Sequence, residues 1–176
     1  MIEHNLVRCN LERHGEAIRE ILNEAIENST ALYDYQPRSK ESMVGWFEAK
    51  RAGDFPVIGI ESPAGELLGF GSYGTFRAWP AFKYSVEHSI YVHNEHRGQG
   101  LGEKLLMAII AAAKEQQKHV LIGGIDSSNT VSIALHEKHG FKKVGELPQV
   151  GFKFGRWLDM AFYQLTLETP LRPIDG

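Results

Sequence analysis

Hydrophobic and polar residues alternate along the stretch YSVEHSIYV, Tyr84–Val92. This period of two is typical of a β-strand, whose successive side chains point to opposite faces of a sheet. Glu87 and His88 are therefore expected to face different surroundings. Over Leu101–Ala112, apolar residues recur every three to four positions, which predicts an amphipathic helix. The sequence thus predicts a strand, a short turn and a long helix.

The same two periods predict the other elements of the chain. Helices are expected behind the capping residues Asn10 and Ser39 and over residues 130–139. Strands are expected at residues 2–8, 55–62, 66–76, 119–125, 141–147 and 156–167. The run at 119–125 is continuously apolar, as in a strand buried on both faces, and the helix before it allows it to lie parallel to the strand at 84–92. No repeat or linker interrupts this order, so the sequence predicts a single α/β domain over residues 1–176.

The charge and hydropathy of the chain limit the kinds of molecule that it is expected to bind. The 176 residues carry a net charge of −3, whereas proteins that bind nucleic acids or anionic membranes usually present a basic surface. The longest apolar run, Leu105–Ala113, is too short to cross a bilayer, and the N-terminus MIEHNLVRCN lacks the pattern of a signal peptide. We therefore expect a cytoplasmic protein whose partner is a small molecule, with no nucleic acid and no membrane.

Cysteine and histidine give little sign of metal or disulfide chemistry. The single cysteine, Cys9, cannot form an internal disulfide and is interpreted as a small buried residue rather than a nucleophile. The eight histidines are scattered, and the close pair of His136 and His139 does not have the ligand pattern of a recognised site. No metal is expected.

Glycine occupies every second position of the turn before the long helix, at Gly98, Gly100 and Gly102. The first turn of a helix has backbone N–H groups without intrahelical partners and lies at the positive end of the helix dipole. Residues without a Cβ allow an anion to reach these groups, so the turn is either a phosphate site or a plain tight turn. A P-loop is excluded because Glu103 and Lys104 replace its Lys and hydroxyl residue, and a dinucleotide fold needs the spacing GxGxxG.

A third motif matches this turn more closely. Residues Arg97–Gly102, RGQGLG, resemble the RxxGxG signature with which the GCN5-related N-acetyltransferase (GNAT) superfamily holds the pyrophosphate of acetyl-coenzyme A. Residues Ile125–Phe141 are similar to its N-x-x-A-x-x-LYEKxGF segment, with His136 where most members carry Tyr. This histidine, the segment VEHSIYV and residues Val150–Leu165 resemble one branch, the phosphinothricin and methionine sulfoximine acetyltransferases.

The resemblance covers nearly the whole chain and implies both a fold and a cofactor. The fold is the α/β GNAT fold, a mixed, mostly antiparallel central sheet of about seven strands with a splayed parallel pair, flanked by helices. The cofactor, used as co-substrate, is acetyl-coenzyme A. In the family, the main chain of the central strand pairs with its pantetheine arm, and the glycine turn holds its pyrophosphate. An Asn side chain binds the arm, and a Lys side chain can reach the phosphates. Carried over to this chain, these residues are Ile90, Tyr91, Val92, Gly98, Gln99, Gly100, Leu101, Gly102, Glu103, Asn129 and Lys138.

The acceptor positions of the same branch fall on two segments of this chain. They are Arg77, Ala78 and Trp79, and Glu87, His88 and Ser89. Arg77 offers the planar bidentate group that binds a carboxylate well, and its Pro-containing loop is interpreted as a lid or a pocket rim.

Four further residues have open assignments. Tyr33 and Tyr35 are either walls of the acceptor pocket or surface and packing residues. Lys153 and Arg156 either bring positive charge to the pocket, from the same chain or across a dimer interface, or lie exposed.

Amide formation from a thioester and an amine needs a base and stabilisation of the departing thiolate, but no nucleophilic residue. Glu87 is the candidate base, with a salt-bridged strand carboxylate as the alternative. His136, as an imidazolium, is the candidate acid for the thiolate, with a capping or packing role as the alternative. The chain has no GxSxG elbow, which agrees with direct transfer.

The predicted function is transfer of an acetyl group from acetyl-coenzyme A to the α-amino group of a small amino acid or analogue, such as phosphinothricin or methionine sulfoximine. Direct attack in a ternary complex and a homodimer are expected. One alternative is an acetyltransferase for another amine, a polyamine or a protein N-terminus; Arg77 disfavours the polyamine. The other is a non-catalytic acyl-coenzyme A sensor, which the presence of Glu87 and His136 disfavours.

Overall fold

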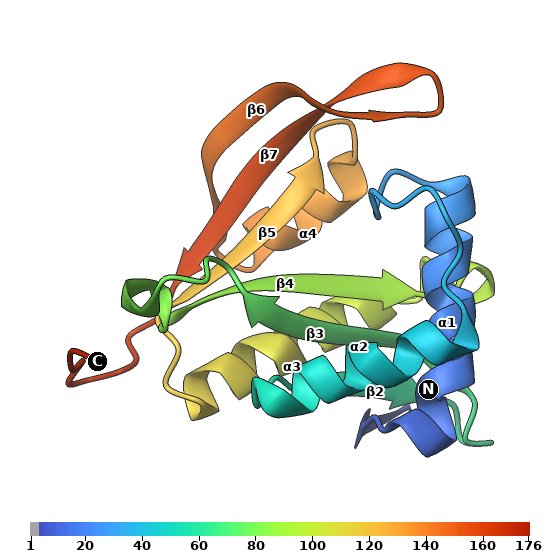
Figure 1. Ribbon diagram of the computed structural model, residues 1–176, viewed down its shortest axis with the longest axis horizontal. Helices are drawn as coiled ribbons and strands as arrows, with labels where there is room; N and C mark the ends of the chain where they lie inside the picture. The colour runs from blue at the N-terminus through green and yellow to red at the C-terminus, as the bar shows by residue number, and fades with distance from the viewer. Residues whose placement is uncertain (1–3) are drawn as a thin grey trace.

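The computed structural model describes residues 4–176, whose strands form a seven-stranded sheet in the order β1-β2-β3-β4-β5-β7-β6 (Figure 1). The strands are β1 (Asn5–Arg8), β2 (Val57–Glu61), β3 (Leu67–Thr75), β4 (Ser85–Val92), β5 (Val120–Asp126), β6 (Lys142–Lys153) and β7 (Arg156–Thr166). β4 and β5 are parallel, and the other neighbouring pairs are antiparallel. The predicted mixed sheet with one parallel pair is confirmed.

Within residues 4–176, four α-helices and two short 3₁₀ helices connect the strands. They are α1 (Leu11–Asn28), α2 (Lys40–Ala52), η1 (Pro80–Phe82), η2 (Asn94–His96), α3 (Leu101–Glu115) and α4 (Thr130–Lys138). Asn10 and Ser39 cap α1 and α2, because their side-chain oxygens accept hydrogen bonds from the backbone N–H groups of Arg13 and Ser42. Both predicted caps are confirmed. No helix in this range combines the length and apolar character needed to cross a membrane.

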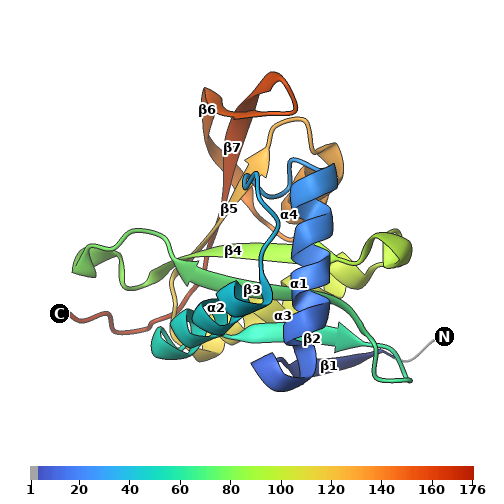
Figure 2. The ribbon, with the colours of Figure 1, turned by 45° about the vertical axis from the view of Figure 1, so that its right-hand side comes forward.

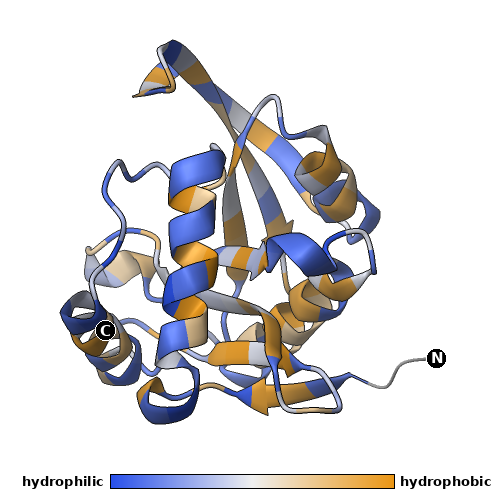
Figure 3. Ribbon diagram, turned by 90° about the vertical axis from the view of Figure 1, so that its right-hand side faces the viewer, coloured by the Kyte–Doolittle hydropathy of each residue, from blue (hydrophilic) through white to orange (hydrophobic). Residues whose placement is uncertain are grey.

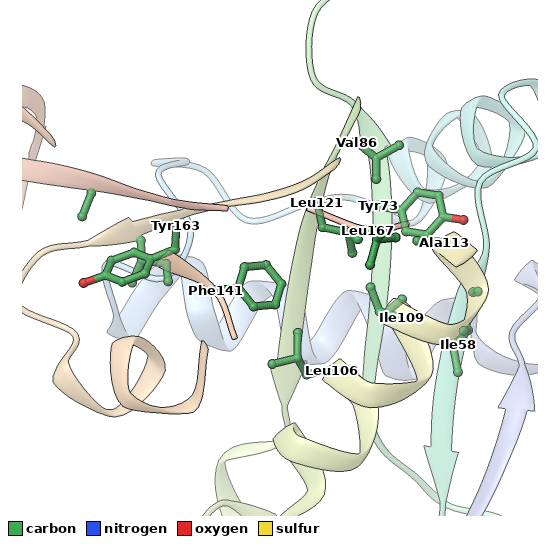
Figure 4. Packing of buried hydrophobic residues seen from close by; sticks show 13 residues of the cluster. Ile58, Tyr73, Val86, Leu106, Ile109, Ala113, Leu121, Phe141, Tyr163 and Leu167 are labelled. Atoms are coloured by element: carbon green, nitrogen blue, oxygen red, sulfur yellow. The ribbon is translucent and has the colours of Figure 1, made fainter. Parts of the chain in front are cut away.

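Helices cover both faces of the sheet. On one face Leu106 and Ile109 of α3 pack in a buried cluster with Val86 and Leu121 of the two parallel strands (Figure 4). α1 and α2 lie on the other face, in front of the strands in Figure 2. The apolar side of α1 faces the sheet, and its outer surface is mostly polar (Figure 3). Burial of the apolar stripe of each helix therefore fixes the two outer layers.

Two glycines of β3 allow α3 to approach the sheet closely. A Cβ on Gly69 would lie 3.2 Å from Cδ1 of Leu105, and one on Gly71 would lie 2.9 Å from Cγ1 of Ile109, both of α3. Both distances are shorter than normal van der Waals contact. The strand sequence LLGFGSYG thus places α3, and with it the glycine turn at its N-terminus, directly against β3 and β4.

Two strands differ from the sequence prediction. β1 begins at Asn5, and residues 2 and 3 of the predicted strand lie outside the described residues. β6 continues to Lys153 instead of ending at residue 147, with a register shift between Leu147 and Gly151. The second half of β6 contains Pro148 and glycine and does not alternate, so its strand conformation comes from pairing with β7 rather than from a local pattern.

Candidate active site

A cleft of about 240 Å³ lies between β4 and β5. The two strands pair only at Ser85, Val86 and Glu87, opposite Val120, Leu121 and Ile122, and then diverge, as Figure 1 shows. The cleft is lined by Ala31, His88, Ser89, Ile90, Tyr91, Val92, Gly102, Gly123, Gly124, Ile125, Asp126, Asn129, Val131, Ser132, Leu135 and His136. Parting of the parallel pair therefore creates the pocket.

Within residues 4–176, the edge of β4 that faces the cleft has no strand partner beyond Glu87. Ile90, Tyr91 and Val92 pair with β3 on their other side, and all three line the cleft. Backbone N–H and C=O groups along a strand edge need partners, and amide groups of an extended ligand can supply them. The contact of these three residues with the pantetheine arm stays a prediction.

The glycine turn lies at the start of α3 with its donors free. Gly98 and Gly100 have φ angles of 76° and 77°, and Gly100 is the N-cap, with no side chain that occupies the first-turn N–H groups. A Cβ on Gly98 or Gly100 would meet no atom within 4 Å, so there is open space beside the turn. Main-chain donors, a positive helix end and open space together fit a pyrophosphate group.

Glu103 and Lys138, both predicted to contact the cofactor, contact each other. Oε1 of Glu103 lies 2.7 Å from Nζ of Lys138 and 2.8 Å from Nε2 of His139. The Lys138 side chain is 64% exposed, so this ion pair is weak and can open. Glu103 is therefore suited to offer its backbone N–H, while its carboxylate is engaged elsewhere.

Asn129 caps α4 at the side of the cleft. Its Oδ1 accepts a hydrogen bond of 3.1 Å from the backbone N–H of Ser132. The amide NH₂ group of Asn129 remains as a donor. Asn129 thus combines a structural role with the predicted contact to the cofactor arm.

Glu87 lies where the two strands part. Its backbone pairs with Gly74 on one side and Ile122 on the other, and its Oε1 would be 3.1 Å from a Cβ on Gly124. Burial raises the pKa of Glu87, and the Arg77 guanidinium partly opposes this shift. The absence of a side chain at Gly124 leaves room for a carboxylate that is a stronger base than an ordinary glutamate.

His88 and His136 form a buried imidazole pair on the opposite face of the sheet from Glu87. Their Nε2 atoms are 2.8 Å apart, and Nδ1 of His136 donates to the carbonyl oxygen of Ser132 at 2.7 Å. Because that bond uses the ring proton of neutral His136, the bond between the rings is donated by Nε2 of His88. Burial and the neighbouring His136 lower the pKa of His88 to about 3, and burial also lowers the pKa of His136.

This pair changes the expectations for both histidines. The His88 side chain does not face the Glu87 side, so only its main chain is placed to contact an acceptor there. From the sequence, His136 is expected to act as an imidazolium, but its burial favours the neutral ring. Its role as the acid stays a prediction.

The other acceptor residues lie on the surface or at the cleft. Arg77, Ala78 and Trp79 form an exposed loop after β3, with the Arg77 guanidinium 5.4 Å from the centre of the Phe76 ring. None of these three residues lines the cleft, so the role of the loop as a rim stays a prediction, but the electrostatic influence of Arg77 reaches Glu87. Ser89 lines the cleft.

The two candidate tyrosine walls differ. Burial raises the pKa of Tyr33 to about 12, with smaller contributions from the charges of Asp126, Tyr91 and Glu87. The Tyr35 hydroxyl instead donates to the carbonyl oxygen of Phe152 in β6. Tyr33 does not line the cleft, so its role as a wall stays a prediction, whereas Tyr35 ties the α1–α2 loop to the β6–β7 hairpin.

Sequence reasoning missed several residues of the cleft. Gly123 and Gly124 leave room for the imidazole pair on one face of β5 and for Glu87 on the other. Two consecutive glycines inside a buried strand were the available signal, since glycine there often marks a close approach. Asp126 follows on the same strand, but the sequence around it contained no comparable signal of a place in the cleft.

Lys153 has neither of the two roles considered from the sequence. Its side chain is 4% exposed, and Nζ donates to the carbonyl oxygens of Ile26, Ser29 and Leu32 at 2.6, 2.8 and 2.7 Å. These carbonyls end α1 and begin the following loop, where no helical partner is available. Lys153 therefore anchors this loop instead of bringing charge to the pocket.

Replacement of Lys153 by methionine is expected to lower the free energy of unfolding by about 2–3 kcal/mol, because three carbonyls would lose their shared donor. Lys142→Met, at an exposed position of the same strand, should change it by less than about 0.5 kcal/mol. Urea denaturation of both variants measures the difference. Equal stability of the two variants would contradict the anchoring role.

Comparison with known proteins identifies the family. Residues 16–141 match the model of the Acetyltransferase (GNAT) family. The chain belongs to this family. It is an acetyl-coenzyme A-dependent N-acetyltransferase, as its sequence motifs predict.

Two relatives within the GNAT family are named for amino-acid analogues. An L-methionine sulfoximine/L-methionine sulfone acetyltransferase of Pseudomonas paraeruginosa is 44% identical over 148 residues, which cover 84% of this chain and 86% of the relative. A phosphinothricin N-acetyltransferase of Streptomyces coelicolor is 29% identical over 92% of this chain and 95% of the relative.

Solved structures confirm the GNAT fold. A protein of Acinetobacter baylyi ADP1 described as an acetyltransferase has a TM-score of 0.98 and 55% identity, and the match covers 100% of this chain and 98% of that chain. One of Salmonella typhimurium, solved with its cofactor acetyl-coenzyme A, has a TM-score of 0.92 and 38% identity, with 98% of each chain covered. A ribosomal-protein-alanine N-acetyltransferase of Brucella melitensis has a TM-score of 0.90 and 40% identity, with 93% and 99% covered.

Proposed function

We propose that this enzyme acetylates the α-amino group of a small amino acid or analogue of the methionine sulfoximine or phosphinothricin kind. The observation that carries the proposal is the position of Glu87, a half-buried carboxylate at the point where β4 and β5 part, within the electrostatic influence of Arg77. A base and a cation at one place fit an acceptor that carries an ammonium and a carboxylate. The names of the relatives support this substrate class.

The residues of the cleft divide the reaction into binding, orientation and proton transfer. Acetyl-coenzyme A supplies the thioester that the amine attacks. The turn at Gly98–Glu103 and the β4 edge would hold the cofactor in register with Glu87. Two reactants in attack geometry gain an effective concentration on the order of 10⁵ to 10⁸ M. Glu87 then takes a proton from the ammonium, directly or through a water, which frees the nitrogen lone pair for attack on the thioester carbon as the carbon–sulfur bond breaks.

His136 is the proposed donor to the departing thiolate, on the strength of its position in the cleft wall. Its one ring proton is on Nδ1 and is directed at the Ser132 carbonyl. Because loss of the only proton of a neutral ring would leave an imidazolate, His136 can protonate the thiolate only after it gains a second proton and becomes an imidazolium. Comparison of the leaving-group dependence of wild-type enzyme and His136→Gln would test this role, because an acid matters most for the most basic thiolate.

Arg77→Ala is expected to raise the KM for carboxylate-bearing acceptors by about 10- to 100-fold, since a charge-assisted hydrogen bond contributes about 1.5–3 kcal/mol. The same amino acids with an amidated carboxyl group serve as the ligand control, and their KM should change by less than about threefold. Initial rates of thiol release measure both. An equal rise for acid and amide would remove Arg77 from carboxylate recognition.

A protein N-terminus is the second candidate acceptor. It is favoured by the similarity to the ribosomal-protein-alanine N-acetyltransferase of Brucella melitensis. A thiol-release assay with a panel of amino acids, amino-acid analogues, polyamines and short peptides with a free N-terminus separates the candidates. We expect turnover with methionine sulfone and methionine sulfoximine; turnover confined to peptides would overturn the proposal.

We also propose that the chain acts as a homodimer and as a single domain over residues 1–176. Exposed apolar side chains on the β6–β7 hairpin support self-association: Val144, Leu147, Val150, Phe152, Phe154 and Trp157 are each more than 40% exposed. Exposed patches of this kind are typical of protein interfaces. Light scattering coupled to size-exclusion chromatography tests the dimer. The cytoplasmic location stays a prediction.

A further inference from the structure

Asp126, the last residue of β5, is a buried carboxylate in the wall of the cleft with one oxygen unused. Its exposed fraction is 3%, and it lines the cleft. Oδ1 accepts hydrogen bonds from the backbone N–H of Ser128 at 2.8 Å and from its hydroxyl at 2.6 Å. Oδ2 has no hydrogen-bond partner among the described residues and is itself buried. Buried carboxylate oxygens are nearly always paired, so Oδ2 indicates a missing donor.

The neighbours of Asp126 keep it ionised without satisfying Oδ2. Burial opposes ionisation, but hydrogen bonds from Ser128, the nearby Thr30 hydroxyl and the charge of Arg156 outweigh it and lower the pKa of Asp126. Nη2 of Arg156 is 3.9 Å from Oδ2, which is beyond hydrogen-bond distance, and the Arg156 side chain is 52% exposed. Oδ2 is therefore an ionised oxygen that receives no hydrogen bond from Arg156.

Asp126 lies on the same face of the sheet as Glu87. Side chains alternate along a strand, so Asp126 and Gly124 share a face, and the Glu87 carboxylate lies beside Gly124. Met160, opposite Asp126 on β7, also contacts the Gly124 position, with Sδ 3.2 Å from a Cβ placed there. Two residues of a strand span about 7 Å, so Asp126 is one same-face step from the base.

We propose that Asp126 binds the ammonium group of the acceptor through Oδ2 and delivers it to Glu87. This inference rests on the proposed function. The alternative donor is an amide N–H of the cofactor arm, but the face that Asp126 shares with Glu87 favours the acceptor. In this arrangement one carboxylate holds the cation and the other removes its proton.

Asp126→Asn is the sharpest test, because the amide oxygen can still accept from Ser128 while an NH₂ group replaces Oδ2. With coenzyme A bound, calorimetry should show at least a tenfold rise in the Kd of L-methionine sulfone. The Kd of coenzyme A itself should stay within twofold. Glu146→Gln is the matched control, because this exposed carboxylate accepts from the neighbouring Ser127 hydroxyl at 3.1 Å but does not line the cleft.

A second ligand separates an ammonium contact from a folding defect. The 2-hydroxy analogue of methionine sulfone lacks the ammonium, so the wild-type enzyme should bind it at least tenfold more weakly than the amino acid. Asp126→Asn should abolish that difference. This ratio does not depend on the fraction of folded protein.

The outcomes distinguish the two proposals. If the wild-type enzyme acetylates no amino acid, the proposed function is wrong, and this inference with it. If methionine sulfone is acetylated and Asp126→Asn binds it as tightly as the wild type, only the inference is overturned. Loss of coenzyme A affinity with unchanged acceptor affinity would instead assign Oδ2 to the cofactor arm.

Discussion

Gly100→Asp is expected to weaken acetyl-coenzyme A binding by about 100-fold. Gly100 has a φ of 77°, and if the turn of the variant relaxes without cofactor, restoring this left-handed conformation on binding costs a residue with a Cβ about 1–2 kcal/mol. The carboxylate would stand at the helix N-terminus where the pyrophosphate is expected, and repulsion there adds about 1–4 kcal/mol. Each 1.4 kcal/mol corresponds to about a tenfold change in affinity, so the sum is large. Calorimetry with acetyl-coenzyme A measures it.

Gly65→Asp is the matched control for this substitution. Gly65 has a φ of 83° and lies in the exposed turn between β2 and β3, so it shares the backbone strain and the added charge but not the helix end. Its cofactor affinity should equal that of the wild type. Normal affinity in Gly100→Asp, or an equal loss in both variants, would refute the pyrophosphate site.

Glu87→Gln is expected to reduce kcat/KM by about 10² to 10⁴ at neutral pH and to leave cofactor affinity within twofold, because it removes a base but not a cofactor contact. Burial raises the pKa of Glu87, and only the ionised carboxylate can accept a proton. The wild-type rate should therefore fall as pH drops through this raised pKa, at a higher pH than an ordinary glutamate near 4.3 would give.

Two further variants check that the acidic limb of the pH profile belongs to Glu87. Arg77 lowers the pKa of Glu87, so Arg77→Ala should move this limb to higher pH. Glu66→Gln, an exposed carboxylate in the β2–β3 turn, should leave the profile unchanged. Rates of Glu87→Gln equal to those of the wild type across the pH range would exclude Glu87 as the base.

Residues that are close in sequence were predicted well. The caps Asn10 and Ser39, the strand of Glu87 and the helix after the glycine turn all follow from short-range spacing, and the structure confirms these elements. The family motifs were local too, since RGQGLG occupies six consecutive residues. The second half of β6 was missed because its conformation depends on its partner strand.

The sequence alone therefore determined the order of the elements and the family. It also placed the glycine turn at a helix start and the candidate base at the start of the cleft. Only the tertiary structure decided which distant side chains meet. His88 contacts His136 across 48 residues, and Lys153 reaches Ile26 across 127. The periods of a helix or a strand indicate which face a residue occupies but not which residue lies opposite, because that depends on how the layers pack. The unpaired oxygen of Asp126 and the burial of Lys153 are consequences of this packing.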